Sequence, residues 1–293
     1  MNSEKITFAP LIVGTMRLGI WGSKYNQSEY ERFIDNCLDL NLTDFDHADI
    51  YGSYTTESEF GAVLSNRKDL RGKVEITTKC GIQYPSDARP KLNVKHYDFS
   101  AKHIIQSVEN SLRNLQVENI KLLLLHRPDY LMEPASIART FEQLQQQGKV
   151  QHFGVSNFTP TQFDLLNSHF PLVNNQIEIS LLKPKALLND HLFHFVNKAI
   201  NITAWSPLGG GQIFDKNQPT QLKTLLKNLS KKYHCQIDQL LFAWLNKHPA
   251  NITAVTGTSK IERIKRALEA QTIQLSQEDW YALLEKSVGQ EVA

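Results

Sequence analysis

Short apolar runs alternate with longer segments of helical periodicity along most of the chain. This regular alternation is the βαβ pattern of a parallel sheet. We expect strands at residues 11–14, 42–46, 74–79, 120–126, 150–155, 172–177, 201–205 and 252–256.

The segments between these runs carry helix signals. Ser28 and Glu31 form a predicted capping box, followed by apolar residues at helical spacing and by Asn41, which suits a helix end. Thr159 before Pro160 matches a cap followed by proline at the first helical position. We expect other helices to begin at residue 56, to cover 104–115, 137–144, 186–199, 219–233, 237–247 and 261–270, and to follow residue 276.

About eight strands in alternation with helices predict a (β/α)8 TIM barrel in the α/β class rather than an open doubly wound sheet. A chain of 293 residues with 41% hydrophobic content is ample for one large core. No Pro/Gly/Ser-rich linker or charge block divides it. We therefore expect one barrel domain over residues 1–293.

Composition excludes several other classes of protein. A formal charge of +2 gives no general attraction to nucleic acid or to a membrane surface. The three cysteines are too few and too scattered for a disulfide framework or a zinc knuckle. The N-terminus lacks the apolar stretch of a signal peptide, and no run approaches the ~20 apolar residues of a membrane span. A soluble, reducing, cytoplasmic setting is expected.

Four polar residues lie at or just after the ends of the predicted strands: Asp46, Tyr51, Lys79 and His126. Barrel enzymes build their sites from the loops after the strands, so these side chains are expected to meet at one mouth as a proton-relay site. Taken singly, each has a plainer interpretation: a structural ion pair, a packed loop tyrosine, or a histidine that merely ends its strand. All four being structural together is the weaker hypothesis.

A zinc site made of His47, His126 and Cys80 is the competing hypothesis. His47 follows Asp46 directly, so its side chain should point to the opposite face of the strand. No metal-ligand spacing supports zinc. We expect no metal at this site.

Eight motifs, in register over about residues 14–268, resemble those of the aldo-keto reductases. They lie at residues 14–19, 44–52, 78–79, 122–126, 154–158, 175–178, 204–211 and 257–264. The resemblance implies that Asp46, Tyr51, Lys79 and His126 are the family's catalytic tetrad. Tyr51 would donate the proton, Lys79 would lower the pKa of Tyr51, Asp46 would hold the lysine, and His126 would orient the carbonyl oxygen.

The resemblance also implies NADP(H) as the cofactor, extended across the barrel mouth. The dinucleotide motif G-x-G-x-x-G of Rossmann domains is missing, which agrees with this. Ser156, Asn157 and Gln176 would hold the carboxamide, and Trp205 would stack on the nicotinamide where many relatives have tyrosine. The full expected set is Gly14, Thr15, Met16, Asp46, Ser156, Asn157, Gln176, Trp205, Ser206, Leu208, Gly209, Gly210, Gly257, Thr258, Lys260 and Arg263.

Two parts of this cofactor site have plainer interpretations as well. Residues 206–211 could be an ordinary glycine-rich turn rather than a pyrophosphate cradle. The basic segment from Lys260 to Arg266 could be a solvated helix face rather than a site for the adenosine 2′-phosphate. By resemblance Arg263 is the phosphate-binding arginine, and Arg266 would add attraction.

The expected activity is reduction of aldehydes or ketones to alcohols with NADPH, with Trp21 beside Tyr51 and His126 in the substrate wall. Two alternatives stay open: a cofactor-binding regulatory or scaffold protein on the same barrel, and a dehydrogenase that works mainly toward oxidation. The expected partner is a small-molecule carbonyl compound. The sequence predicts neither its identity nor the oligomeric state.

Overall fold

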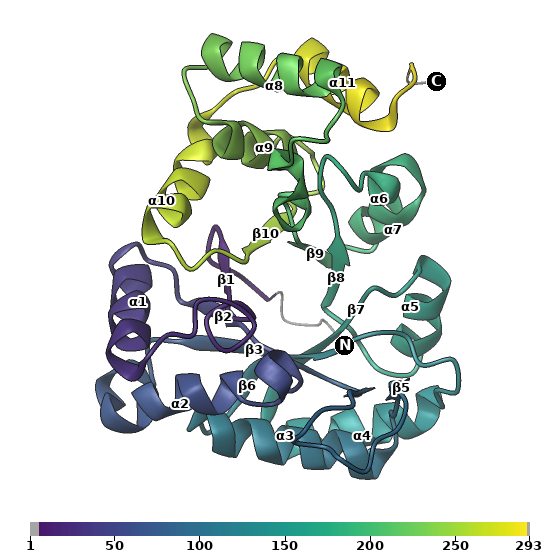
Figure 1. Cartoon of the computed structure of the whole chain (residues 1–293). Helices are drawn as coiled ribbons and strands as arrows, with labels where there is room; N and C mark the ends of the chain where they lie inside the picture. Colours follow the sequence, from purple (N-terminus) through teal and green to yellow (C-terminus); the bar gives the residue numbers. More distant parts are fainter. Residues whose placement is uncertain (1–5, 292–293) are drawn as a thin grey trace.

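A closed barrel of eight parallel strands forms the centre of the molecule in the computed structural model, which describes residues 6–291 (Figure 1). The predicted (β/α)8 barrel is confirmed as a single domain, while the ends of the expected range 1–293 lie outside the described residues. The strand order around the barrel is β1-β10-β9-β8-β7-β6-β3-β2. The strands are β1 (Ile12–Gly14), β2 (Asp44–Asp46), β3 (Glu75–Cys80), β6 (Ile120–Leu125), β7 (Val150–Ser156), β8 (Asn174–Glu178), β9 (Asn201–Trp205) and β10 (Thr253–Thr256).

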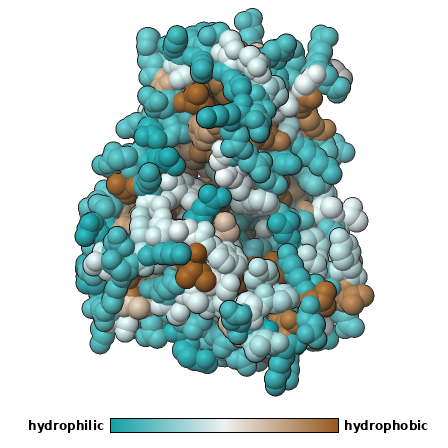
Figure 2. Space-filling view, in the orientation of Figure 1, coloured by the Kyte–Doolittle hydropathy of each residue, from teal (hydrophilic) through white to brown (hydrophobic). Residues whose placement is uncertain are grey.

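Helices surround this barrel and bury their apolar faces against it. They are α1 (Gln27–Asp39), α2 (Thr56–Asn66), α3 (Ala101–Leu115), α4 (Pro134–Gln146), α5 (Pro160–Asn167), α6 (Lys185–Leu188), α7 (His191–Asn197), α8 (Thr220–Lys232), α9 (Ile237–Asn246), α10 (Ile261–Glu269) and α11 (Gln277–Val288). Among the described residues no helix is long and apolar enough to cross a membrane. Figure 2 shows one face of the molecule, mostly hydrophilic with small, separate apolar spots.

The start of α1 differs from the prediction. Asn26, not Ser28, is the cap: its side chain accepts from the Glu29 amide at 3.0 Å, and the Glu29 carboxylate accepts from the Asn26 amide at 2.9 Å. Both sequence pairs have the spacing of a capping box, and the one nearer the N-terminus starts the helix two residues earlier than predicted. The cap at Thr159 is confirmed.

The single helix expected at residues 186–199 is wrong. The segment forms α6 and α7, because Asn189 between them is extended, with φ −121° and ψ −179°. The Asn189 side chain accepts from the His191 amide at 3.1 Å, a local bond that competes with continuing the helix.

A short antiparallel hairpin of β4 (Ile82–Gln83) and β5 (His96–Tyr97) is inserted between β3 and α3. Ile82 packs with Ala48 and Ile50 in a separate apolar cluster, and four partly buried tyrosines pack against this cluster. Those tyrosines are Tyr51, Tyr54, Tyr84 and Tyr97. The hairpin therefore brings aromatic side chains to the carboxyl end of the barrel.

Close contact between neighbouring strands aligns their carboxyl ends. Gly14 pairs with Asp46, and a Cβ at Gly14 would lie 2.6 Å from the Thr256 carbonyl oxygen, so only glycine fits between β2 and β10. Asp46 pairs in turn with Thr77, and Lys79 lies two residues farther along β3. The ends of these strands form one rim, on which the polar side chains meet.

Candidate active site

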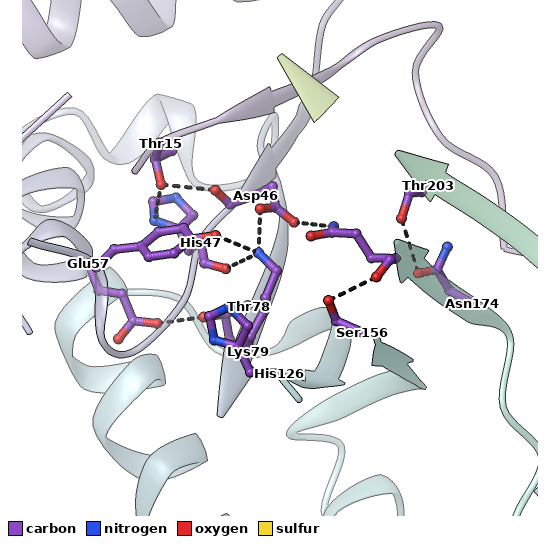
Figure 3. Close-up of polar contacts among 12 residues, drawn as sticks. Thr15, Asp46, His47, Glu57, Thr78, Lys79, His126, Ser156, Asn174 and Thr203 are labelled. Atoms are coloured by element: carbon purple, nitrogen blue, oxygen red, sulfur yellow. Dashed lines mark hydrogen bonds and ion pairs between the residues drawn. The ribbon is translucent and has the colours of Figure 1, made fainter. Parts of the chain in front are cut away.

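Lys79 lies at the centre of a buried polar network (Figure 3). Its ammonium group donates to the Asp46 carboxylate, to the His47 carbonyl oxygen at 2.8 Å and to the Tyr51 hydroxyl at 3.1 Å. Since an ammonium has three donors, all of its hydrogen-bonding capacity is used. With the Lys79 side chain only 1% exposed, its position is fixed.

Asp46 is held through both its carboxylate and its backbone oxygen. Its second oxygen accepts from the Gln176 side-chain amide at 2.7 Å, and its backbone oxygen accepts from the amide of Thr15 at 3.0 Å and from the Thr15 hydroxyl at 2.9 Å. Burial lowers the pKa of Lys79, but Asp46 and Tyr51 more than offset that effect, so the pKa lies above its ordinary value. Lys79 is therefore charged at neutral pH.

The phenol of Tyr51 departs from the sequence-based expectation. Burial raises its pKa and the Lys79 ammonium lowers it, while Asp46 raises it again. The net result is a pKa above the ordinary value, so the expected net lowering is wrong, although Lys79 acts in the expected direction. Tyr51 is consequently neutral at pH 7 and carries the proton that a general acid must supply.

His126 follows β6 directly, and its ring centroid lies 6.0 Å from that of Tyr51 in an edge-on arrangement. Burial, then the charges of Lys79, Arg127 and Lys95, hold its pKa well below the ordinary value. It is a neutral imidazole at pH 7. Its Nδ1 atom is buried without a hydrogen-bond partner among the described residues.

The residues of the zinc hypothesis do not come together. His47 turns away from Lys79: its Nδ1 lies 3.0 Å from the Thr15 hydroxyl, and its ring packs on Phe60 with centroids 4.7 Å apart. Burial, then the Lys79 charge, lowers the pKa of His47 to about 3. In the part of the chain that the structure describes, no group of three or more His, Cys, Asp or Glu residues could hold a metal ion.

The four residues expected around a nicotinamide form one hydrogen-bonded chain that involves β7, β8 and β9. Asn157, in left-handed conformation with φ 63°, accepts from the Trp205 indole nitrogen at 2.9 Å and donates to the Ser156 hydroxyl at 2.8 Å. Ser156 donates to the Gln176 backbone oxygen at 2.9 Å. The Asn157 amide also donates to the His126 carbonyl oxygen at 3.4 Å, which joins this chain to the segment that carries His126.

The glycine-rich loop after β9 presents its backbone to the outside. Ser206, Gly209, Gly210 and Gly211 all have positive φ, which glycine adopts without strain. Around Gly211 no heavy atom lies within 4 Å of an added Cβ, so its backbone is open to a ligand. Leu208, just before the loop's short helix, is partly buried against the core instead.

The other predicted cofactor residues divide into supporting and exposed positions. The Thr15 side chain is committed to Asp46 and His47, so it supports the rim rather than facing outward. Met16 is 37% exposed beside it. Gly257 has open space around it, and the hydroxyl of Thr258 accepts from the Lys260 amide at 3.2 Å.

The segment 16–25 after β1 contacts the loops after β9 and β10, which the sequence did not reveal. Its Arg17 donates to the Gly210 carbonyl oxygen at 3.3 Å. At its other end the Ser23 hydroxyl donates to the Ser259 hydroxyl at 2.7 Å, and the Tyr25 hydroxyl donates to the Ser259 carbonyl oxygen. We call residues 16–25 the strap, because they tie the β9 and β10 loops together.

The basic side chains of residues 260–266 differ in whether a carboxylate binds them. Arg266 is bound to the Asp238 carboxylate at 2.9 and 2.7 Å, so it is neutralised and the attraction expected from it is not supported. Lys260 and Arg263 are exposed and make no ion pair within residues 6–291. These two remain available to an anion.

An aromatic wall stands beside the tetrad. Trp21, 37% exposed, lies with its ring centroid 6.4 Å from that of Tyr51 and 5.9 Å from that of Tyr84. Trp21 thus lies beside Tyr51, and its place in a substrate wall stays a prediction. Tyr84 was missed because its hairpin is too short to predict.

Comparison with known proteins places this geometry in context. Residues 10–287 match the sequence profile of the Aldo/keto reductase family. The oxidoreductase YcsN of Bacillus subtilis is 40% identical over 99% of this chain and 98% of its own, and the oxidoreductase YdhF of Escherichia coli is 38% identical over 99% of each. A 6-dehydroglucose reductase of Agrobacterium fabrum is 38% identical over 99% and 98%.

Solved structures share the fold. The glycerol dehydrogenase of Gluconobacter oxydans superimposes with a TM-score of 0.82 at 22% identity, over 98% of this chain and 94% of its own. A thermostable aldo-keto reductase, Tm1743, has a TM-score of 0.79 at 22% identity over 95% of each chain.

Proposed function

This chain belongs to the aldo/keto reductase family, and from that premise we propose that it reduces small aldehydes or ketones to alcohols with NADPH. The observation that carries the proposal is the buried chain from Asp46 through Lys79 to the hydroxyl of Tyr51. Oxidoreductase activity of the family fits a site whose terminal group is a neutral phenol next to a fixed cation.

The side chains of the site supply the proton and orient the carbonyl group of the substrate. When bound, the cofactor supplies a hydride to the carbonyl carbon. The carbonyl oxygen then becomes negative, and Tyr51 donates its proton to that oxygen to give the alcohol. Lys79 stabilises the phenolate that remains until water returns the proton. His126, as a neutral imidazole, donates a hydrogen bond that orients the carbonyl oxygen.

The residues present fit a nicotinamide dinucleotide. Ser156, Asn157 and Gln176 would hold the carboxamide, and Trp205 would offer an aromatic face. The guanidinium of Arg127 lies 5.4 Å from the centroid of the Trp205 ring, so the nicotinamide needs the opposite face of the indole. The open glycine backbone after β9 suits a pyrophosphate.

NADP rather than NAD is favoured by the free cations of α10. Arg263 in the opening turn of α10 and Lys260 just before it form no ion pair with any described residue. Backbone N–H groups at this helix start also favour an anion. The 2′-phosphate is the part of NADP that would use them.

The scaffold alternative is less favoured by this site. Binding a cofactor without turnover needs neither a buried lysine nor a phenol hydrogen-bonded to it, and burying that ion pair costs stability. Oxidation of an alcohol by the same groups is the reverse reaction, with Tyr51 taking the proton back.

A carbonyl screen tests the proposal. The purified protein is mixed with NADPH and a panel of aldehydes and ketones, sugar-derived aldehydes among them because a 38% identical relative is named a 6-dehydroglucose reductase. Loss of NADPH absorbance with stoichiometric alcohol is the expected result. Tight NADPH binding without turnover on any compound, in either direction, would favour the scaffold instead.

A further inference from the structure

Tyr54 lies just after the proposed proton donor and has a backbone conformation that is unusual for a tyrosine. Both residues belong to one turn after β2, in which Tyr51–Ser53 forms a single helical turn and Tyr54 follows it. The φ of Tyr54 is 73°, in the left-handed region, which is strained for a bulky side chain. Such strain persists only where other contacts offset it, so the contacts of Tyr54 indicate its role.

The Tyr54 hydroxyl makes two hydrogen bonds with the backbone of one residue, Tyr84. It accepts from the Tyr84 amide at 2.9 Å and donates to the Tyr84 carbonyl oxygen at 3.1 Å. The Arg89 guanidinium lies 4.8 Å from the centroid of the Tyr54 ring, a cation–π contact. Tyr84 and Arg89 both belong to residues 84–95, which join β4 to β5. The Tyr54 side chain therefore holds this connecting loop at two places.

The connecting loop depends on Tyr54 for its hydrogen bonds to the barrel. Among the described residues, the other hydrogen bonds made by residues 84–95 stay within the hairpin. The Arg89 amide donates to the Ser86 carbonyl oxygen at 2.8 Å, and the Val94 carbonyl oxygen pairs with the ring of the neighbouring His96 at 3.0 Å. Without the Tyr54 hydroxyl, side-chain packing alone would hold the loop in place.

Tyr84 stands at the far end of a row of aromatic rings that begins at the proposed proton donor. The ring centroid of Tyr84 lies 5.9 Å from that of Trp21 in an edge-on contact, and the Trp21 centroid lies 6.4 Å from that of Tyr51. Edge-on contacts of this kind fix how the rings are oriented relative to one another. The position of the Trp21 ring beside Tyr51 therefore depends on where the connecting loop holds Tyr84.

We propose that Tyr54 is a positioning residue for carbonyl reduction, because it ties the turn that carries Tyr51 to the loop that carries Tyr84 and so places the Trp21 ring beside the proton donor. A substrate whose carbonyl oxygen meets Tyr51 would pack a ring next to the carbonyl group on Trp21. Tyr54 takes no part in proton transfer, since its hydroxyl is committed to Tyr84. This inference rests on the proposed reductase function.

Tyr54→Phe tests the link, because phenylalanine keeps the ring and the strained backbone and removes only the hydroxyl. Amide exchange of a peptide that contains Tyr84, measured by mass spectrometry without substrate, should become about 10-fold faster, since the amide loses its acceptor. KM for benzaldehyde should rise about 3- to 10-fold with little change in kcat. KM for propanal, which has no ring to pack on Trp21, and NADPH affinity should not change.

Tyr97→Phe is the matched control. Tyr97 packs against the same apolar cluster as Tyr54, and its hydroxyl makes no hydrogen bond with a described residue. This variant should leave amide exchange at Tyr84 and both KM values unchanged. Tyr84→Ala removes the ring that contacts Trp21 and should raise KM for benzaldehyde as Tyr54→Phe does.

Unchanged amide exchange at Tyr84 in Tyr54→Phe would overturn the proposal. So would an equal rise of KM for benzaldehyde and propanal, or a lower free energy of unfolding with both KM values unchanged, since Tyr54 would then only stabilise the fold. If the wild type reduced no aldehyde at all, the reductase function itself would fail. In that case faster exchange in Tyr54→Phe would still support the link between Tyr54 and the loop, and unchanged exchange would still overturn it.

Discussion

Replacing Arg263 by alanine should weaken NADPH binding and leave NADH binding unchanged. The two cofactors differ by one phosphate, which carries close to two negative charges at neutral pH. A hydrogen bond to a charged group contributes about 1.5–3 kcal/mol, which corresponds to a loss of about 10- to 100-fold in affinity. NADH has no group at this position and loses nothing.

The structure narrows the expected loss of NADPH affinity. Arg263 has no carboxylate to release before it binds a phosphate, since no ion pair engages it within the described residues. Because Arg263 is exposed to solvent, salt screens its charge. We therefore expect Arg263→Ala to lower NADPH affinity about 10-fold at physiological salt and by a larger factor at low salt.

Arg266 provides a matched control on the same helix. Its guanidinium is held by Asp238 at 2.9 and 2.7 Å, so Arg266→Ala removes the same charge without removing a free ligand for phosphate. Both variants and the wild type are titrated with each cofactor by fluorescence at two salt concentrations. Equal losses for NADH and NADPH in Arg263→Ala, or a matching loss of NADPH affinity in Arg266→Ala, would refute the reasoning.

Three further outcomes follow from the site and the barrel. Tyr51→Phe should keep cofactor affinity by fluorescence titration but lower turnover by about 10²-fold or more, and near-normal turnover would remove Tyr51 from the role of acid. Because the Lys79 charge lowers the pKa of Tyr51, Lys79→Met should shift the alkaline limb of its residual reductase pH profile to higher pH, and a shift to lower pH would contradict that coupling. Gly14→Ala should lower the free energy of unfolding in urea by about 1–3 kcal/mol, since its Cβ would meet the Thr256 carbonyl oxygen, whereas Gly257→Ala has open space and should cost less; equal costs would contradict the steric account.

The barrel was predictable because its signals are local. Each strand is a short apolar run bounded by turns, and the residues at the carboxyl ends of such runs must share one rim once the sheet closes. That argument brought Asp46, Lys79 and His126 together without any knowledge of distances. It failed where two local signals compete, as at Asn26 and Ser28, and where one polar side chain redirects the backbone, as at Asn189.

The strap and the electrostatic balance of the mouth could not be predicted in the same way. Arg17 meets Gly210 and Tyr25 meets Ser259 across more than half of the sequence, and no local pattern encodes such contacts. The net pKa shift of Tyr51 depends on how much water the finished fold removes from the phenol, a property of packing rather than of spacing.

The buried ion pair of Asp46 and Lys79 serves the proposed activity but lowers thermal stability. Removing two charges from water costs several kcal/mol for each ion, and apolar pairs of similar volume are often neutral or more stable. Selection for thermal stability alone would therefore favour replacing both residues of the pair by apolar ones. Lys79 and Asp46 are only 1% and 2% exposed, so the cost of removing their charges from water falls almost wholly on the folded protein.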